Sequence, residues 1–282
     1  MVVRKMALPA GWYPRHRSEV EDSVASWRAF SSSVAGTPSA LAAVAPHAGW
    51  VFSGRFASRA VQSLAEADTV AVIGGHLPAF ASPLAAYEDG FDTPLGPIEA
   101  DPELLGALAD AFGERFGGVV GKDEDRDNTV EVQLPLVRLR FPAARLLWLR
   151  APNGPAAIEL GAALAAAAAS TGRRLVCLGS TDLTHYGPSY GFSPKGRGPA
   201  AEDWVRGVND RRFIEALLAL DPAEALRRGE TDGSACSSGA AAAALSFALS
   251  AGASRAELLG YGTSLETRRD ESFVGYAALA FY

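Results

Sequence analysis

Short apolar runs alternate along the chain with longer segments in which apolar residues recur every three to four positions, which is the spacing of a helix face. The short runs predict buried strands at residues 41–45, 69–73, 145–149 and 174–178, and a final strand pair at 257–262 and 273–281. The longer segments predict helices at residues 18–30, 55–65, 101–112, 156–170, 202–220 and 236–250, with a helical or mixed segment at 131–139. This alternation is typical of an α/β fold with a central, mostly parallel or mixed sheet flanked by helices.

The length of the chain and the absence of a visible linker favour one domain. The 282 residues would be enough for two domains, but α/β folds often reach this length as a single unit. We therefore expect a single α/β domain over residues 1–282.

Composition and charge argue against several classes of protein. A chain with 48% hydrophobic and 21% charged residues can form an ordinary globular core. Its net charge of -6 argues against a nucleic-acid partner, which would require a basic surface. We see neither a secretory signal nor a stretch that could span a membrane, and two cysteines suit a reducing compartment. We therefore expect a cytoplasmic protein with no nucleic-acid or membrane partner.

Three of the four histidines come just after predicted strands. These are His47, His76 and His185, and Asp182 precedes the last of them. In open α/β sheets, ligands bind outside the carboxyl ends of the strands, where residues far apart in sequence converge. A single histidine in such a place could equally be a core residue bonded to the backbone. Two strand ends of the same kind, one of them with a glycine pair that lets the backbone approach a ligand closely, favour a site.

Two further features add chemistry to this site. Cys236 is predicted at the start of an alanine-rich helix, where the helix dipole favours the thiolate. The alternative is a buried, unreactive cysteine, which is how we interpret Cys177. Asp182 and His185 are three residues apart, so on a helical turn Asp182 could bond His185 and fix its tautomer for acid or base work. Alternatively, Asp182 caps a turn and His185 is exposed.

Two polar segments are predicted to be loops. The charged run at residues 122–128 is interpreted as a solvated loop without a function. Residues 187–199 are rich in Gly, Pro and Ser and follow His185, so this loop could also cover the site.

Six motifs along the chain point to one family. They are AGWYP at 10–14, PHAGW at 46–50 with Ser53–Gly54, TPLG at 93–96, VEVQLP at 130–135, STDLTHYG at 180–187 and VGYA at 274–277. From about residue 10 to its end, the chain resembles the MEMO family, whose bacterial and archaeal members are known as AmmeMemoRadiSam system protein B. That family is similar in fold to LigB-type class III extradiol dioxygenases, which use non-haem Fe(II) to open catechol rings.

The resemblance implies a pocket with a metal-binding trio, two polar neighbours and an aromatic wall. The trio is His47, His76 and Cys236, the neighbours are Asp182 and His185, and the wall is Trp12. In the dioxygenases a carboxylate takes the third ligand position, so Cys236 is a departure from standard Fe(II) oxygenase chemistry. Two imidazoles and one thiolate fit Fe, Cu or Zn, and affinity alone does not choose among these metals.

The chain also departs from the pattern of the MEMO family itself. Asn128 stands where many members have a histidine, and residues 237–240 replace a glycine-rich turn after Cys236. Asn128 cannot act as a general base. We therefore expect a polar contact from Asn128, and acid or base work from His185.

Three functions fit these observations. The first is a metal-dependent oxidoreductase related to extradiol dioxygenases, in which the trio holds the ion and His185, oriented by Asp182, moves protons. The second is a non-catalytic accessory protein that handles metal or binds a peptide, with the radical-SAM and AMMECR-type partners that the resemblance implies. The third is a nucleophilic hydrolase, which requires a histidine about 3 Å from Cys236.

Overall fold

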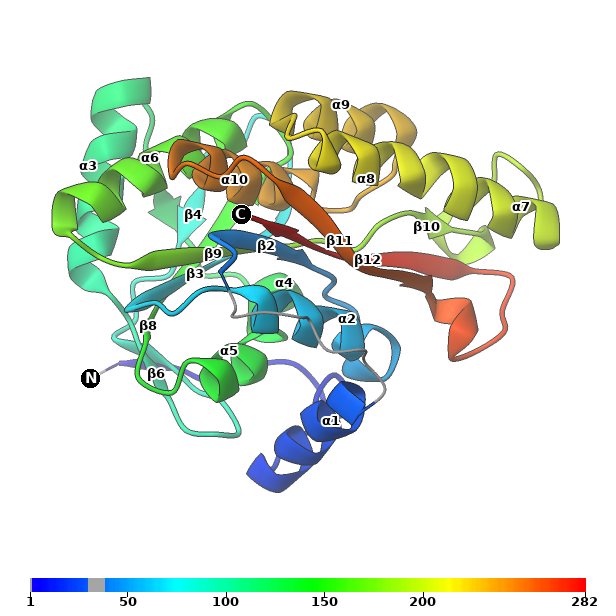
Figure 1. The fold of residues 1–282 in the computed structure, drawn as a ribbon, viewed down its shortest axis with the longest axis horizontal. Helices are drawn as coiled ribbons and strands as arrows, with labels where there is room; N and C mark the ends of the chain where they lie inside the picture. The colour runs from blue at the N-terminus through cyan, green and yellow to red at the C-terminus, as the bar shows by residue number, and fades with distance from the viewer. Residues whose placement is uncertain (1, 30–38) are drawn as a thin grey trace.

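The computed structural model describes residues 2–29 and 39–282, and it confirms the α/β fold class (Figure 1). Its main sheet has nine strands. They are β2 (Ala42–Ala45), β3 (Thr69–Leu77), β4 (Leu84–Ala85), β7 (Gly121–Lys122), β8 (Arg145–Pro152), β9 (Leu175–Ser180), β10 (His185–Tyr186), β11 (Ala256–Thr263) and β12 (Phe273–Phe281). A separate small sheet contains β1 (Val3–Arg4), β5 (Gly90–Phe91) and β6 (Ile98–Glu99).

The main sheet is mixed, with a parallel centre. Its order is β10-β12-β2-β9-β3-β8-β4-β7, and β11 pairs with β12. The central strands β2, β9, β3 and β8 are parallel, while β12 and β4 join them in antiparallel fashion. Every residue of β2 and β9 is buried, as expected of strands covered on both faces. Because Ala45 pairs with Ser180 and Ile73 pairs with Gly179, the carboxyl ends of three strands lie side by side.

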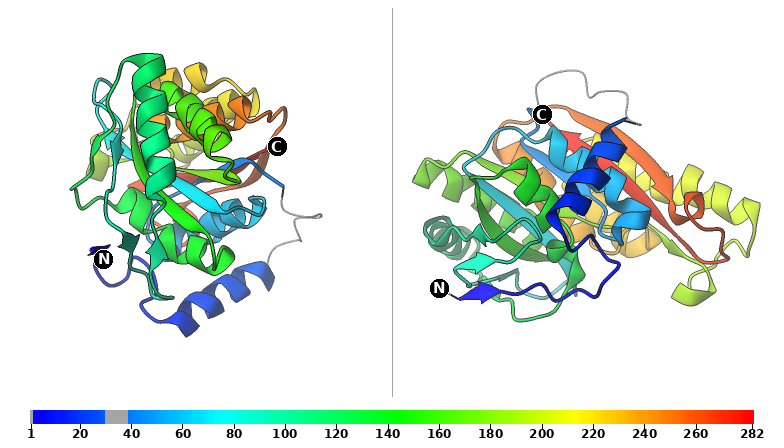
Figure 2. Two further views of the ribbon diagram at one scale, coloured as in Figure 1. Left: turned by 90° about the vertical axis from the view of Figure 1, so that its left-hand side faces the viewer. Right: turned by 90° about the horizontal axis from the view of Figure 1, so that it is seen from below.

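Helices cover both faces of this sheet (Figures 1 and 2). On one face lie α3 (Pro102–Phe116), α6 (Ala156–Thr171), α8 (Asp210–Leu218), α9 (Pro222–Asp232) and α10 (Ser238–Ser250). On the other lie α2 (Trp50–Ser63), α4 (Asn128–Glu131) and α5 (Leu134–Arg140), with α1 (Arg17–Ala29) packed outside α2 and α5. Two apolar clusters, one on each side of the sheet, form most of the core.

Several predicted boundaries differ from the structure. The predicted strands at 69–73 and 174–178 extend further, to Leu77 and Ser180. The predicted helix at 236–250 begins only at Ser238, and the segment at 131–139 is divided between α4 and α5. The last residue of the helix predicted at 18–30 lies outside the described residues, whereas the rest forms α1.

The helix predicted at residues 202–220 is interrupted. It consists of α7 (Pro199–Trp204), a π-helical turn (Val205–Asn209) and α8. At the junction Asp210 is fully buried and accepts hydrogen bonds from the backbone N–H of Thr184, at 3.0 Å, and from the hydroxyl of Tyr261, at 2.8 Å. The break in the helix therefore coincides with a buried polar contact to the segment before β10.

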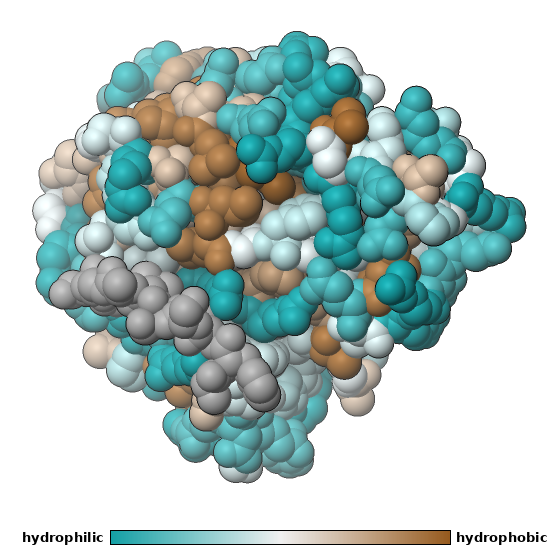
Figure 3. Space-filling model, turned by 45° about the vertical axis from the view of Figure 1, so that its right-hand side comes forward, coloured by the Kyte–Doolittle hydropathy of each residue, from teal (hydrophilic) through white to brown (hydrophobic). Residues whose placement is uncertain are grey.

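Hydrophilic residues predominate on the face shown in Figure 3, where apolar residues gather in one area. Among the helices that the structure describes, none is long and apolar enough to cross a bilayer.

Candidate metal centre

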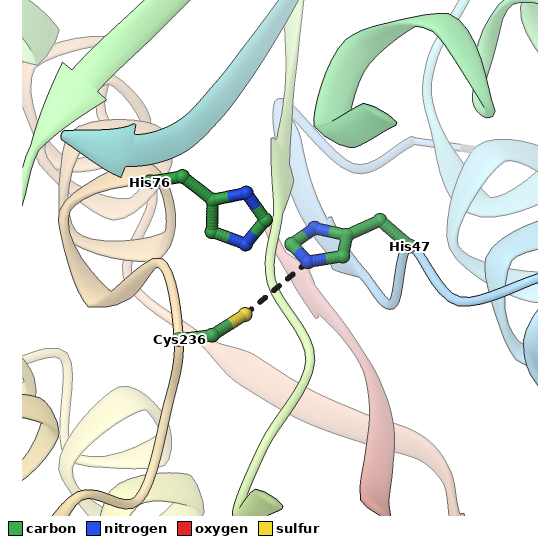
Figure 4. A group of neighbouring side chains, drawn as sticks. All are labelled: His47, His76 and Cys236. Carbon is green, nitrogen blue, oxygen red and sulfur yellow. Dashed lines mark hydrogen bonds between the residues drawn. The ribbon is translucent and has the colours of Figure 1, made fainter. Parts of the chain in front are cut away.

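The carboxyl edge of the parallel strands brings the predicted trio together. His47 follows β2, His76 lies near the end of β3, and Cys236 comes from the segment just before α10. Figure 4 shows the three side chains pointing toward one another. One ligand atom from each residue can be chosen so that all three atoms lie within 4.8 Å of one another.

His47 is buried and held from several sides. Its Nε2 lies 3.2 Å from Cys236 Sγ, and its Nδ1 lies 3.3 Å from the hydroxyl of Ser180. The backbone N–H of His47 donates to Asp182 Oδ1 at 2.7 Å, while the amide of Asn128 donates to the His47 carbonyl at 3.2 Å. These contacts fix the ring with Nε2 toward Cys236, and they give Asn128 the polar contact that we expected of it.

His76 is fixed through its outer nitrogen. Its Nδ1 lies 2.9 Å from Asp127 Oδ2, and this hydrogen bond, together with Cys236, raises the pKa of His76 to about 10. The ring centroid lies 5.0 Å from that of His47, with the planes 80° apart. His76 has a φ of +60°, at an irregularity in the pairing of β3 with β8. The left-handed backbone and the Asp127 contact thus set the direction of this ring.

Cys236 is held at the backbone. Its N–H donates to the carbonyl of Asp182 at 3.2 Å. The amide of Asn153 donates to the Cys236 carbonyl at 3.1 Å and accepts from the N–H of Gly239, in the first turn of α10, at 3.0 Å. Asn153 therefore ties Cys236 to the amino end of α10, the helix terminus that favours a negative charge.

Neighbouring charges shift the pKa of the cluster. Burial by itself raises the pKa of the Cys236 thiol, but the charge and hydrogen bond of His47, with His185 and His76 nearby, hold it well below its ordinary value. Burial lowers the pKa of His47, but the charges of Cys236 and Asp182 outweigh burial and raise it. Without a metal, these shifts favour a thiolate on Cys236 and a proton on the imidazole of His47.

Asp182 and His185 lie together, but not on a helical turn as predicted. The chain is extended here because His185 begins β10, which pairs with β12. Nε2 of His185 is 3.9 Å from Asp182 Oδ2, longer than a hydrogen bond, whereas Asp182 Oδ1 accepts from the N–H groups of His47 and Ala48. Burial lowers the pKa of His185, but Asp182 and Cys236 raise it to about 10. His185 Nε2 is buried with no hydrogen-bond partner among the described residues.

A pocket of about 520 Å³ adjoins the cluster. Three imidazoles line it, those of His47, His76 and His185. The lining also includes the aromatic side chains of Trp12, Phe52, Tyr190 and Tyr276, and the charged side chains of Asp182, Arg268 and Asp270. The Tyr190 ring centroid is 4.9 Å from that of His185. Trp12 thus lines this pocket, and the segment after His185 contributes one of its walls.

The prediction of a solvated loop at residues 122–128 is wrong for two of its residues. Asp123 is fully buried, and Asp127 contacts His76. A local signal for Asp127 was present, because it caps α4 by accepting from the N–H of Thr129 at 2.9 Å. That capping pattern identifies a helix start but does not reveal which histidine the second carboxylate oxygen meets.

The glycine pair before His76 has a different role from the one predicted. A Cβ atom on Gly75 would collide with Ser237, and one on Gly74 would collide with the hydroxyl of Thr129. These glycines therefore allow protein segments, rather than a ligand, to approach β3. Because Ser237 follows Cys236, this close packing also places the cysteine.

These observations define the class: an α/β protein with a cluster of two histidines and one cysteine at the carboxyl edge of a parallel sheet. The donor set fits a transition metal, because His47 and His76 each have Nδ1 close to a polar oxygen and Nε2 left for the ion. Ligating histidines are ordinarily held in this way. His47 Nε2 also meets the distance that a cysteine nucleophile requires of its base.

Comparison with known proteins identifies the family. The chain belongs to the Memo family, because it matches the Memo-like protein family over residues 4–280. It is 34% identical over 246 residues to a MEMO1 family protein of Methanococcoides burtonii, covering 85% of each chain. It is 32% identical over 287 aligned positions to a MEMO1 family protein of Methanosarcina acetivorans, covering 99% of each.

One solved structure shares the fold. The crystal structure of an uncharacterized protein from Escherichia coli K12 superposes with a TM-score of 0.53 at 14% identity, covering 84% of this chain and 98% of that one. This likeness concerns the fold alone.

Proposed function

We propose that this protein is a metal-dependent enzyme, an oxidoreductase of the kind that the resemblance to extradiol dioxygenases implies. His47 Nε2, His76 Nε2 and Cys236 Sγ would hold the ion beside a pocket for a small molecule. The observation that carries the proposal is the placement of three ligand atoms within 4.8 Å of one another, with His47 and His76 of this trio lining the pocket. When bound, the ion supplies a Lewis-acid position open to the pocket.

Convergence of imidazoles on one sulfur favours this proposal over a cysteine hydrolase. A nucleophilic cysteine needs one base, oriented by a third group. Here His47, His76 and His185 all lie around Cys236, and among the described residues the hydrogen-bond partner of His47 Nδ1 is the hydroxyl of Ser180 rather than a carboxylate. Several imidazoles around one thiolate are typical of a metal site, where neutral rings share one ion.

The remaining polar residues would orient and protonate. Asp182 accepts from the N–H groups of His47 and Ala48. Its main role would therefore be to hold the backbone of His47, a proposed ligand, in place. His185 lines the pocket, and its imidazole would exchange a proton with a bound molecule. Trp12 and Tyr190 supply apolar walls for that molecule.

Oxygen uptake tests the enzymatic proposal. Protein loaded anaerobically with Fe(II) or Cu(I) would be mixed with oxygen and a panel of small aromatic compounds, including catechols. We expect uptake that depends on one compound class, that His47→Ala abolishes and that His16→Ala, a histidine outside the cluster, leaves unchanged. The proposal is contradicted if none of the compounds supports oxygen uptake by the metal-loaded protein, or if uptake is equally fast after His47→Ala.

A second candidate, a metal-handling accessory protein, is favoured by one observation. The third donor is the sulfur of Cys236, and a soft thiolate suits Cu(I) better than a carboxylate does. In this role the protein would act with a radical-SAM or AMMECR-type partner and need not turn over a substrate. Tagged protein purified from its native host should then carry Cu and capture such a partner. If it carries no Cu and captures no such partner, this candidate is rejected.

A further inference from the structure

A buried arginine lies behind the candidate centre. Arg150 belongs to β8 and is 3% exposed. Its guanidinium meets three carboxylates of the segment before α4: Asp125 Oδ2 at 2.7 Å, Asp123 Oδ1 at 3.2 Å and Asp127 Oδ2 at 3.7 Å. Of these, Asp127 also accepts from His76 Nδ1. The positive charge is therefore linked to the centre through a single shared carboxylate.

Arg150 also holds the backbone just before His76. Its Nε donates to the carbonyl of Gly75 at 2.9 Å. The N–H of Gly75 in turn donates to the hydroxyl of Thr129 at 3.2 Å, and Asp127 Oδ1 accepts from the Thr129 N–H. Gly75, the residue before His76, is thus bonded through its carbonyl to the guanidinium and through its N–H to Thr129, which Asp127 caps.

The backbone of His76 needs such support. Its φ of +60° lies in the left-handed region, which residues other than glycine rarely adopt without surrounding contacts. The side chain is 34% exposed, so packing alone does not fix its ring. The contacts of Arg150 and Asp127 are what define both the backbone before His76 and the nitrogen that faces Cys236.

We propose that Arg150 is a positioning residue of the metal centre, acting through the Gly75 carbonyl and the Asp127 carboxylate. With Asp127 accepting the Nδ1 proton of His76, Nε2 is the nitrogen that would give up its proton to an ion and serve as the ligand atom. This inference rests on the proposed function, since it concerns a ligand of the proposed ion. Arginine suits the role because its planar fork reaches a carbonyl and several carboxylates at once, which an ammonium group cannot do.

Three substitutions separate this role from general electrostatics. Arg150→Lys keeps the charge but loses the fork. Asp127→Asn keeps the Oδ1 cap of Thr129 but presents an N–H to His76, which would move the ring proton to Nε2. Asp125→Asn is the matched control, because Asp125 also bonds Arg150 but, within the described part of the chain, forms no hydrogen bond or ion pair with His76.

Zinc affinity is the first measurement. Competition with a chromophoric chelator gives the apparent dissociation constant of Zn(II) for each variant, and urea unfolding of metal-free protein shows that each is folded. We expect Arg150→Lys and Asp127→Asn to weaken binding by about 10- to 100-fold, as loss of an outer hydrogen bond to a ligating histidine does. Asp125→Asn should bind as the native chain does.

Imidazole ¹⁵N NMR of the zinc-loaded protein is the second measurement. The native chain should show His76 with a protonated Nδ1 and a coordinated Nε2, and Asp127→Asn should lose that pattern. A native chain that binds neither zinc nor Fe(II) nor Cu(I) refutes the proposed function. A native chain that binds zinc while all variants bind equally, or while Asp125→Asn weakens binding as much as Asp127→Asn, overturns the role of Arg150 and leaves the metal centre standing.

Discussion

His47 Nε2 lies 3.2 Å from Cys236 Sγ, although the two residues are 189 positions apart in the chain. The contact depends on how closely α10 packs on the sheet. A Cβ on Gly179 of β9 would lie 2.5 Å from the Ala240 carbonyl oxygen and 2.9 Å from the Ala244 Cβ. Small residues on both sides therefore let the helix lie against the strands, which brings the cysteine before it to the histidine after β2.

The depressed pKa of Cys236 predicts selective alkylation. In metal-free native protein, iodoacetamide at pH 6 should modify Cys236 faster than it modifies free cysteine, because the thiolate is already formed. Cys177 should not react, because it is fully buried and burial raises its pKa. Peptide mass spectrometry at successive times measures both rates.

Bound metal should then protect Cys236. Zinc-loaded protein is expected to react much more slowly, because the sulfur is coordinated. Alkylation that is equally fast with and without zinc would argue for the free nucleophile of a hydrolase, and a rate that rises only toward pH 8.5, the ordinary cysteine value, would contradict the thiolate assignment.

Gly75→Ala should disturb the centre through packing. The added methyl group would collide with Ser237, next to Cys236, and overpacking of this kind costs about 1–3 kcal/mol. We expect a lower free energy of unfolding in urea and weaker zinc binding. Gly106→Ala is the matched control: Gly106 lies inside α3 with open space around it, so alanine should stabilise the protein by about 0.5–1 kcal/mol. Equal effects of the two substitutions would refute the packing argument.

The buried carboxyl of Asp210 should make stability depend on pH. Burial raises its pKa from 3.8 to about 6 against the opposing hydrogen bonds of Thr184 and Tyr261 and the charge of Arg206. Because the folded state holds the proton more tightly than the unfolded state, the stabilisation is present below about pH 4 and is lost as the pH rises through about 6.

Asp210→Asn removes this titration. The difference in free energy of unfolding between the variant and the native chain should shift in favour of the variant by on the order of 2 kcal/mol when the pH is raised from 4 to 7.5. Urea unfolding at both pH values measures the difference. If the gap between the two proteins does not change with pH, or changes in the opposite direction, Asp210 is not the titrating group.

Local patterns predicted the strands and the convergence of His47 with His76. Apolar runs identify β2 and β3, and the histidine that follows each run must lie at the carboxyl edge because parallel strands share that edge. Cys236 could be placed only through the resemblance and its position before a helix. None of these features depends on knowing how distant side chains pack.

The supporting residues could not be predicted in the same way. Asp127 reaches His76 from the cap of α4, and Arg150 reaches the carbonyl of the preceding Gly75 from β8, the strand that pairs with β3. The charged run at 122–128 has the composition of a solvated loop. Asp123 is nevertheless buried, because Arg150 of another strand meets its carboxylate. The helical turn predicted from the Asp182–His185 spacing is wrong. Pairing of β10 with β12 makes this segment extended, and the spacing of the two residues does not reveal that pairing.

Elemental analysis of protein purified anaerobically, without a metal-binding tag, tests the central claim most directly. The native chain and the His47→Ala, Cys236→Ser and His16→Ala variants would be compared before and after reconstitution with Fe(II), Cu(I) or Zn(II). The account predicts close to one equivalent of one transition metal in the native chain and in His16→Ala, and loss of that metal in the other two. A native chain that holds no metal even after reconstitution, or a Cys236→Ser variant that holds as much as the native chain, would contradict it.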